Sequence, residues 1–229
     1  MKEKECGRDA RAPRVGDAPD ESPYLGWHSR GYLPHFDGGE ISQFITFRLY
    51  DSLPAALLNT WRDMLEHLPK TEAELELRNR IEEHLDKGAG SAWLKNPAIA
   101  RVIENALLHF DGRRYRLHSW VVMPNHVHVL LTPSAEHGIP GIVHSMKSFT
   151  AKESNRLLGM KGKFWQPDYY DRYIRNEDHY YMTIEYIEMN PVKAGLCESR
   201  EQWEFGSARK ACPWSAGVPP ANKVRKQRE

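Results

Sequence analysis

Three segments have the apolar patterns of β-strands, and the first alternates apolar and polar positions, which predicts a strand with one face on a core. In the first, 43–50, the side chains of Ile45, Phe47 and Leu49 share a face. The other two, 114–123 and 126–132, are separated by Pro124 and Asn125, a turn signal between two strand patterns. These two segments are therefore expected to form a β-hairpin.

Five segments place apolar residues at helical spacing, at about 54–68, 71–85, 97–110, 140–158 and 177–190. Asp51 or Ser52 is expected to cap the first helix, and Pro191 is expected to end the last near Asn190. The second helix is very acidic, and its charges are read as a solvated face. The order strand, helices, strand, strand, helix predicts an α+β fold with a ferredoxin-like antiparallel sheet, in which residues 52–112 are a helical insertion after the first strand.

The two ends of the chain differ in composition from the middle. Residues 1–22 are charged and nearly free of apolar side chains, so they are expected to be a disordered lead. Residues 208–229 combine Pro, Gly and Ala with cations, which predicts a basic disordered tail able to touch phosphates. Residues 23–207 are expected to form one domain, because a chain of 229 residues supports one substantial core.

Composition excludes some classes of protein. Lys and Arg total 32 against 31 Asp and Glu, so the net charge does not argue for nucleic-acid binding, and any such case rests on local clusters. Three cysteines without a Cys-x-x-Cys pair suit a reducing compartment. No apolar run approaches the roughly 20 residues of a membrane span, and the first residues lack the apolar part of a signal peptide. The sequence predicts a cytoplasmic protein without a membrane partner.

Residues 159–175 are rich in aromatic and basic side chains. Between residues 140 and 175 there are seven Lys or Arg against three Asp or Glu. Aromatic rings interleaved with cations suit single-stranded nucleic acid, because bases stack on the rings and phosphates pair with the cations. The alternative is an aromatic loop that packs on the core.

His126 and His128 are two residues apart in a predicted strand, so both imidazoles project from the same face. Two strand residues advance about 6.5 Å, which lets the two rings lean toward one metal ion. Metal centres normally have three or more ligands, so the pair predicts a third ligand elsewhere. The alternative is one half-buried strand histidine and one surface histidine.

The helix expected at 177–190 begins at Asn176, a capping residue. At about 100° per residue, Ile184 and Ile187 share one face, whereas Tyr186 and Asn190 fall roughly opposite. If the helix packs over the histidine face, the Asn190 amide oxygen joins the two imidazoles around a divalent ion, with the Tyr186 phenol beside it. The alternatives are a surface tyrosine, and an Asn190 that caps a short helix begun by Pro191.

Five sequence blocks, in order, resemble the REP-associated tyrosine transposases of the single-tyrosine HUH superfamily. These blocks are MPNHVHVL at 123–130, KSFT at 147–150, FWQP at 164–167, YIRN at 173–176 and YIEMNPVKAGL at 186–196. The resemblance covers roughly residues 33–207 and is strongest from 114 to 196. The 52–112 segment is longer than the corresponding segment of the minimal family domain. Residues 31–37 contain no Lys or Arg, so recognition of a guide sequence there is not predicted.

The resemblance implies an HUH-type enzyme that nicks and rejoins single-stranded DNA beside REP-type hairpins through a 5′-phosphotyrosine. Tyr186 matches the nucleophile, His126 and His128 match the HUH metal ligands, and Asn190 matches the third ligand of a Mg²⁺ or Mn²⁺ ion. The implied partner is single-stranded or hairpin DNA, bound by a monomer or a homodimer. The expected DNA-binding residues are Lys147, Lys152, Lys163, Trp165, Gln166, Arg172 and Arg175.

Two other functions stay open at this point. One is a catalytically silent protein that binds hairpin DNA or RNA. The other is a zinc hydrolase that uses the histidine pair, although the sequence offers no obvious carboxylate base close to it.

Overall fold

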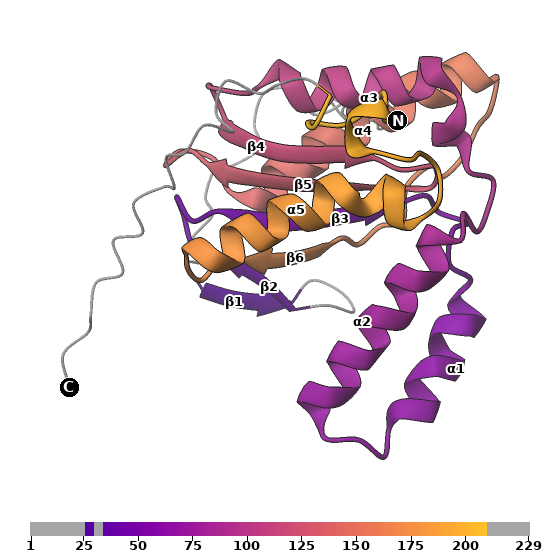
Figure 1. The fold of residues 1–229 in the computed structure, drawn as a ribbon, viewed down its shortest axis with the longest axis vertical. Helices are drawn as coiled ribbons and strands as arrows, with labels where there is room; N and C mark the ends of the chain where they lie inside the picture. The colour runs from indigo at the N-terminus through magenta and orange to yellow at the C-terminus, as the bar shows by residue number, and fades with distance from the viewer. Residues whose placement is uncertain (1–25, 30–33, 210–229) are drawn as a thin grey trace, which may run out of the picture.

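A four-stranded antiparallel sheet forms the centre of the molecule (Figure 1). The computed structural model describes residues 26–29 and 34–209, so the predicted lead and nearly all of the predicted tail lie outside the described residues. The strands are β3 (Gln43–Arg48), β4 (Tyr115–Val122), β5 (His126–Pro133) and β6 (Tyr170–Tyr173), in the order β4-β5-β3-β6. With one crossover between β3 and β4 and another between β5 and β6, this is the predicted ferredoxin-like connection, and the α+β class is confirmed.

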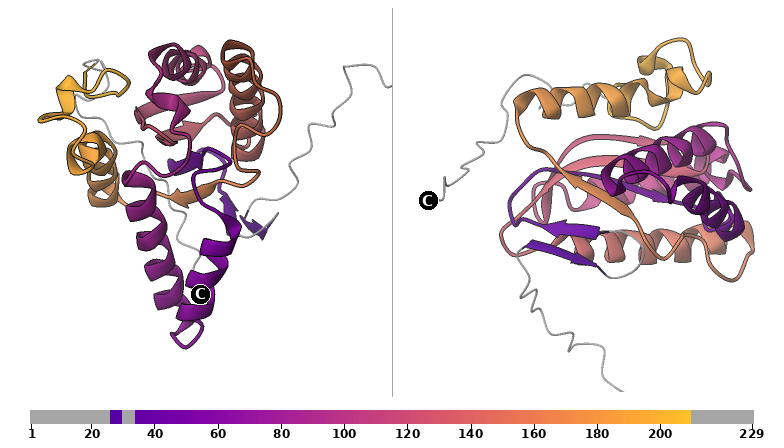
Figure 2. Two further views of the ribbon diagram at one scale, coloured as in Figure 1. Left: turned by 90° about the vertical axis from the view of Figure 1, so that its right-hand side faces the viewer. Right: turned by 90° about the horizontal axis from the view of Figure 1, so that it is seen from below.

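Helices cover both faces of the sheet (Figure 2). On one face α3 (Pro97–His109) and α4 (Ile139–Leu158) pack on the large core, which contains Ile45, Phe47, Val127 and Val129. On the other face α5 (Glu177–Lys193) packs on a smaller apolar cluster. The strand alternation explains the division, because odd positions of β3 and β5 face α3 and α4, whereas even positions face α5.

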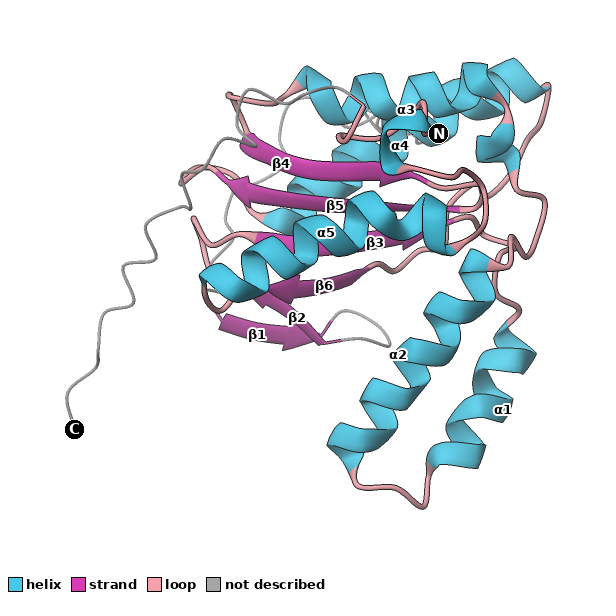
Figure 3. Cartoon of the chain, in the orientation of Figure 1, coloured by secondary structure: helices cyan, strands magenta, loops and turns pink. Residues whose placement is uncertain are grey.

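The segment between β3 and α3 forms a helical arm that projects from one end of the sheet (Figure 3). It consists of α1 (Ala55–Leu65) and α2 (Lys70–Asp86), followed by a 3₁₀ turn at Trp93–Lys95. Both arm helices agree with the periodicity of the sequence. The expected cap of α1 is wrong, because Pro54 occupies that position, the Asp51 carboxylate accepts the Ser91 backbone N–H at 2.8 Å, and the Ser52 hydroxyl donates to the Leu49 carbonyl.

Four elements, β1 (Gly26–Ser29), β2 (Pro34–Asp37), β6 and α5, differ from the sequence expectation. A two-stranded antiparallel sheet of β1 and β2 precedes β3. The basic aromatic segment contains β6, which pairs with β3. The last helix does not end at Asn190, because α5 continues through Pro191 to Lys193. A 3₁₀ turn at Arg200–Gln202 follows α5. Within the described residues, no helix is long and apolar enough to span a membrane.

Candidate active site

The two histidines meet at the start of β5, on the sheet face that α5 covers. His126 and His128 are each 1% exposed, and their Nε2 atoms are 3.0 Å apart. Burial lowers the pKa of His126 to about 3 and the pKa of His128 well below its usual value, so both rings are neutral near pH 7. Neutral imidazoles with converging nitrogens are the form in which histidine binds metal.

Hydrogen bonds to the far side of each ring set its orientation. Asn125 donates through Nδ2 to the carbonyls of Leu85 and Ala89, at 3.1 and 2.8 Å, so its Oδ1 faces His126 Nδ1 at 2.7 Å as an acceptor. His126 therefore carries its proton on Nδ1 and leaves a lone pair on Nε2. His128 Nδ1 lies 2.7 Å from the Thr46 hydroxyl, which either donates or accepts and so permits a lone pair on His128 Nε2 as well.

Tyr186 lies against this pair. Its ring centroid is 5.4 Å from that of His128 and 5.8 Å from that of Phe44. Burial, followed by the nearby Glu82 and Asp86 carboxylates, raises the pKa of the Tyr186 phenol, so the phenol is protonated near neutral pH. The structure thus brings the predicted nucleophile to the predicted metal ligands.

Asn190 lies one helical turn beyond Tyr186 and is fully buried. Neither atom of its side-chain amide has a hydrogen-bond partner among the described residues. The continuous helix excludes the alternative that Asn190 caps a helix begun by Pro191. The expectation that Tyr186 and Asn190 lie opposite the apolar face of α5 is wrong, since Asn190 is buried on the same side as Thr183 and Ile187.

Two carboxylates from α2 complete the surroundings. Asp86 Oδ1 is 3.8 Å from His126 Nε2, and the Glu82 carboxylate accepts a hydrogen bond from Arg78 Nε at 2.9 Å. Burial and the neighbouring Glu82 raise the pKa of Asp86 to about 6. The sequence offers no obvious carboxylate close to the histidines, but the acidic arm brings Asp86 there through the fold.

The donors fit a divalent ion with nitrogen and oxygen ligands. The two Nε2 atoms are separated by the distance expected of neighbouring ligands on one ion with bonds of about 2.1 Å. The buried, unpartnered Asn190 amide offers an oxygen that a hard cation prefers. Among the described residues no three His, Cys, Asp or Glu side chains are gathered as a ready metal cluster, so a site here depends on this amide oxygen.

The expected DNA-binding residues do not form one patch. Lys163 and Tyr50 are both exposed, and the Lys163 ammonium lies 5.0 Å from the centre of the Tyr50 ring. Tyr50 follows the end of β3, where Arg48 pairs with His126 at the start of β5. Arg172, which pairs with Phe44, and exposed Arg175, which follows β6, lie near the opposite end of β3. Exposed Lys152 lies on α4, on the other face of the sheet. Their contacts with DNA stay a prediction.

The remaining three candidates make interactions within the protein. Lys147 Nζ donates to the carbonyls of Gln166, Pro167 and Asp168 at 2.6, 2.8 and 3.3 Å, and burial lowers its pKa to about 8. Trp165 is 6% exposed and donates its indole N–H to Thr150 at 2.9 Å, so stacking on a base would require it to leave the core. The Gln166 side chain donates to the Tyr50 carbonyl.

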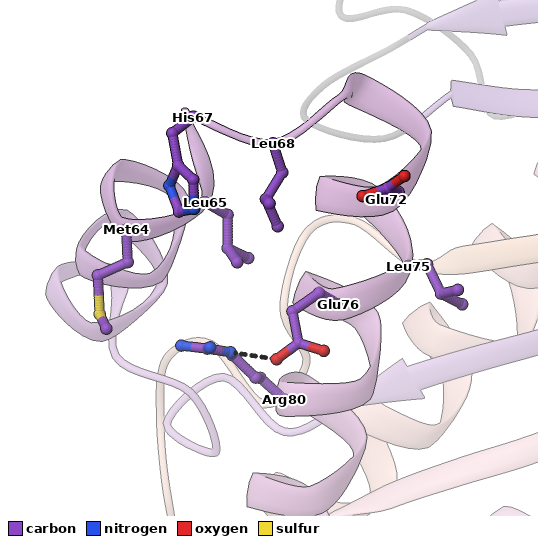
Figure 4. A pocket seen from close by; sticks show the side chains of 8 residues that line it. All are labelled: Met64, Leu65, His67, Leu68, Glu72, Leu75, Glu76 and Arg80. Carbon is purple, nitrogen blue, oxygen red and sulfur yellow. Dashed lines mark hydrogen bonds and ion pairs between the residues drawn. The ribbon is translucent and has the colours of Figure 1, made fainter.

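A pocket on the arm is separate from this site. It lies between the far ends of α1 and α2 and is lined by Met64, Leu68, Leu75 and the Glu76–Arg80 ion pair, among others (Figure 4). Glu72 at the pocket and Asp86 at the histidines are about 21 Å apart along the helix, at 1.5 Å per residue. The pocket is therefore not part of the histidine site.

Comparison with known proteins points to the same segment. Residues 93–190 match a family model described as transposase IS200 like. A REP-associated tyrosine transposase of Escherichia coli K12 is 30% identical over 96 residues, which cover 42% of this chain and 55% of that protein. Residues 93–190 are therefore similar to the IS200-like transposases. The resemblance predicted from the five motifs is confirmed, although the match spans only about half the length of the curated relative.

A solved structure of a REP-associated tyrosine transposase bound to a REP hairpin is 21% identical, with a TM-score of 0.47 over 83% of this chain and 88% of that chain. The segment matched to the IS200-like transposase family contains His126, His128, Tyr186 and Asn190 but stops short of the arm and of β3. Glu82 and Asp86 thus lie outside the part of this chain that matches the transposase model.

Several polar residues of the site are not found from the sequence. Thr46 and Arg48 pair with His128 and His126 across the sheet, so all four side chains share a face. The alternation that places Ile45 and Phe47 in the core carries this signal. Asn125 is recognisable only as a turn residue, and the sequence gives no local sign that α2 reaches the histidines.

Proposed function

We propose that the protein is a metal-dependent transposase that nicks and rejoins single-stranded DNA near REP-type hairpins through a 5′-phosphotyrosine. One observation carries the proposal: the histidine pair on β5 and the tyrosine on α5, some 60 residues apart in sequence, meet on one face of the sheet. The relationship to IS200-like transposases over residues 93–190 supports the same assignment.

In the proposed reaction, Tyr186 Oη attacks the phosphorus of the scissile phosphodiester. A bond forms between Tyr186 Oη and phosphorus, the bond from phosphorus to the 3′ oxygen breaks, and the departing strand ends in a 3′-hydroxyl. The phosphodiester energy is kept in the tyrosyl ester, so attack by a 3′-hydroxyl rejoins DNA without ATP.

The proton of the phenol must leave as the new bond forms, because the raised pKa keeps Tyr186 protonated in the resting protein. Glu82 is the carboxylate that we assign to accept it, since among the neighbouring charges Glu82 has the largest effect on the pKa of the phenol. The 3′ oxygen takes up a proton from solvent on departure.

His126, His128 and Asn190 are the residues that we propose to hold Mg²⁺ or Mn²⁺. When bound, such an ion supplies positive charge that polarises the phosphoryl oxygens. Asn125 and Thr46 orient the two imidazoles, which is the role that outer hydrogen bonds commonly have at metal sites. Lys163 and Tyr50, at the same end of the sheet, suit a phosphate and a stacked base of the incoming strand.

The test is covalent attachment of DNA. The wild-type protein is incubated with labelled single-stranded hairpins from around its gene in the presence of Mg²⁺ or Mn²⁺, and denaturing gels report a protein–DNA adduct. Tyr186→Phe is expected to abolish the adduct and to leave hairpin binding within about twofold, because only the nucleophilic oxygen is removed.

Tyr181→Phe is the matched control, since Tyr181 lies on the same helix and is 44% exposed. It is expected to form the adduct at the wild-type level. An adduct formed by Tyr186→Phe contradicts the assignment of the nucleophile. Hairpin binding by the wild-type protein without any adduct, whichever ion is added, would instead favour the catalytically silent binding protein.

A further inference from the structure

One stripe of α2 faces the candidate active site. Arg78, Glu82 and Asp86 are spaced by four residues, so they lie one above another on the same side of the helix. Arg78 Nη1 donates to the Tyr170 hydroxyl at 3.2 Å, and Asp86 Oδ1 lies 3.8 Å from His126 Nε2. The acidic helix is therefore a wall of the site along its second half.

Unsatisfied polar atoms gather where this wall meets α5. Asp86 Oδ1 and both amide atoms of Asn190 are buried and have no hydrogen-bond partner among the described residues. Asn190 has no exposed surface at all. Buried acceptors without partners are rare in native proteins, and several at one place indicate a missing ligand.

The oxygen atoms in this group identify the kind of ligand. Lys193 Nζ lies 5.3 Å from the Tyr186 ring centre, and its charge acts to lower the pKa of Asp86, so the last turn of α5, which also contains Asn190, lies within electrostatic reach of Asp86. The two imidazoles are neutral, and Arg78 donates a hydrogen bond to Glu82. Two further cations act on the pKa values of the site: Arg48 on His126 and Lys193 on Asp86. A carboxylate oxygen, an amide oxygen and two imidazole nitrogens are donors that suit a divalent cation such as Mn²⁺.

We propose that Asp86 is a fourth protein ligand of the divalent ion assigned to His126, His128 and Asn190. This inference rests on the proposed function, because it adds a ligand to that ion. Neighbouring ligands of an octahedral ion lie about 3.0 Å apart, so Asp86, at 3.8 Å from His126, must rotate slightly inward on binding. The insertion between β3 and α3 then completes the metal site.

The experiment measures Mn²⁺ binding to the full-length protein without DNA, by titration with detection of free Mn²⁺ by electron paramagnetic resonance. Asp86→Asn and Asp86→Ala are both expected to weaken Mn²⁺ binding by about tenfold or more, and Asp86→Ala at least as much as Asp86→Asn. The loss is expected to persist at high salt, because a direct ligand is not screened as a distant charge is. Circular dichroism checks that each variant is folded, and Asp86→Ala serves if Asp86→Asn does not fold.

Glu82→Gln is the matched control, because it removes a neighbouring charge from the same stripe. It is expected to weaken Mn²⁺ binding at most about fivefold, the effect of a screened charge. An equal loss in Glu82→Gln and Asp86→Asn, or wild-type affinity in a folded Asp86 variant, overturns the inference. His126→Ala separates the two proposals: if it leaves Mn²⁺ binding unchanged, the proposed metal site itself fails, whereas a loss there without a loss at Asp86 refutes only the fourth ligand.

Discussion

Asn125 is the residue that connects the histidine turn to the arm. Its amide donates to the carbonyls of Leu85 and Ala89 and accepts from His126. Asn125→Ala is expected to lower the free energy of unfolding by about 2–3 kcal/mol, because two carbonyls and one imidazole lose their partner in a buried place. Loss of the orienting bond is expected to weaken Mn²⁺ binding by about 10–100-fold. Urea denaturation and Mn²⁺ titration measure the two effects.

Asn96→Ala provides the comparison for Asn125→Ala. Asn96 caps α3 by accepting the Ala98 N–H at 3.0 Å and makes no contact with the histidines. Its loss is expected to cost about 1 kcal/mol of stability with unchanged Mn²⁺ affinity. Equal Mn²⁺ affinity in both variants would show that Asn125 does not orient His126.

At the scale of single residues, spacing predicted part of the site. His126 and His128 follow from strand alternation, and Tyr186 with Asn190 follows from helical spacing once a partner face is assumed. Thr46 becomes visible only with the register of β3 against β5, because its pairing with His128 is long-range. Asp86 gives no sequence signal, since its place depends on how the whole of α2 docks.

At the scale of elements, the loop after α2 sets the orientation of the helix face that contains Arg78, Glu82 and Asp86. Gly90 has φ +85°, and an added Cβ would lie 2.9 Å from the Asp51 carbonyl oxygen. Gly88 has φ +75° with open space around it. Gly88→Ala is expected to cost about 1–2 kcal/mol from backbone strain alone. Gly90→Ala is expected to cost more, because the backbone of Asp51 must also move.

Urea denaturation of the two glycine variants separates strain from contact. The difference between them is expected to be at least about 1 kcal/mol, the usual scale of a forced steric shift. Equal losses would mean that the Asp51 backbone gives way freely and does not fix the loop.

Elements with strong local patterns were predicted, and those set by distant contacts were not. The β4–β5 hairpin and α4 follow from local periodicity and turn residues. β6 has only four residues and pairs with β3 more than 120 positions away in sequence, so no local pattern marks it. The rule that proline ends a helix failed at Pro191, because the residue sits in the last turn of α5, where the Ala194 N–H still reaches the Asn190 carbonyl at 3.0 Å.

At the scale of the whole molecule, a buried charge cluster joins the small sheet to the large one. His35 on β2 lies 2.5 Å from an Asp171 oxygen through Nδ1 and 3.0 Å from Asp168 through Nε2. The Phe36 backbone N–H donates to the other Asp171 oxygen at 3.0 Å. The sequence offered no indication of this link, because its partners are more than 130 residues apart.

The cluster makes stability depend on pH. Burial alone would lower the pKa of His35, but Asp168 and Asp171 outweigh it and raise the pKa from 6.5 to about 9. Because the pKa of His35 is higher in the folded protein, the contribution of His35 to the free energy of unfolding is complete below pH 6.5 and is lost as the pH rises toward 9. The loss is at most about 3 kcal/mol, because a pKa difference of one between the folded and unfolded states corresponds to about 1.4 kcal/mol.

The measurement is the free energy of unfolding by urea from pH 6 to pH 10, for the wild type and for His35→Asn. Lys147, which faces Asp168 and has a lowered pKa of about 8, acts in the opposite direction, because its neutral form is favoured in the folded state as the pH rises. The wild-type curve alone therefore does not isolate His35, but the difference between the two curves does. That difference is expected to shrink steadily between about pH 6.5 and 9, since the asparagine side chain of the variant cannot titrate. A constant difference would show that the imidazole is not charged in the folded protein, and that the two sheets are held by neutral hydrogen bonds.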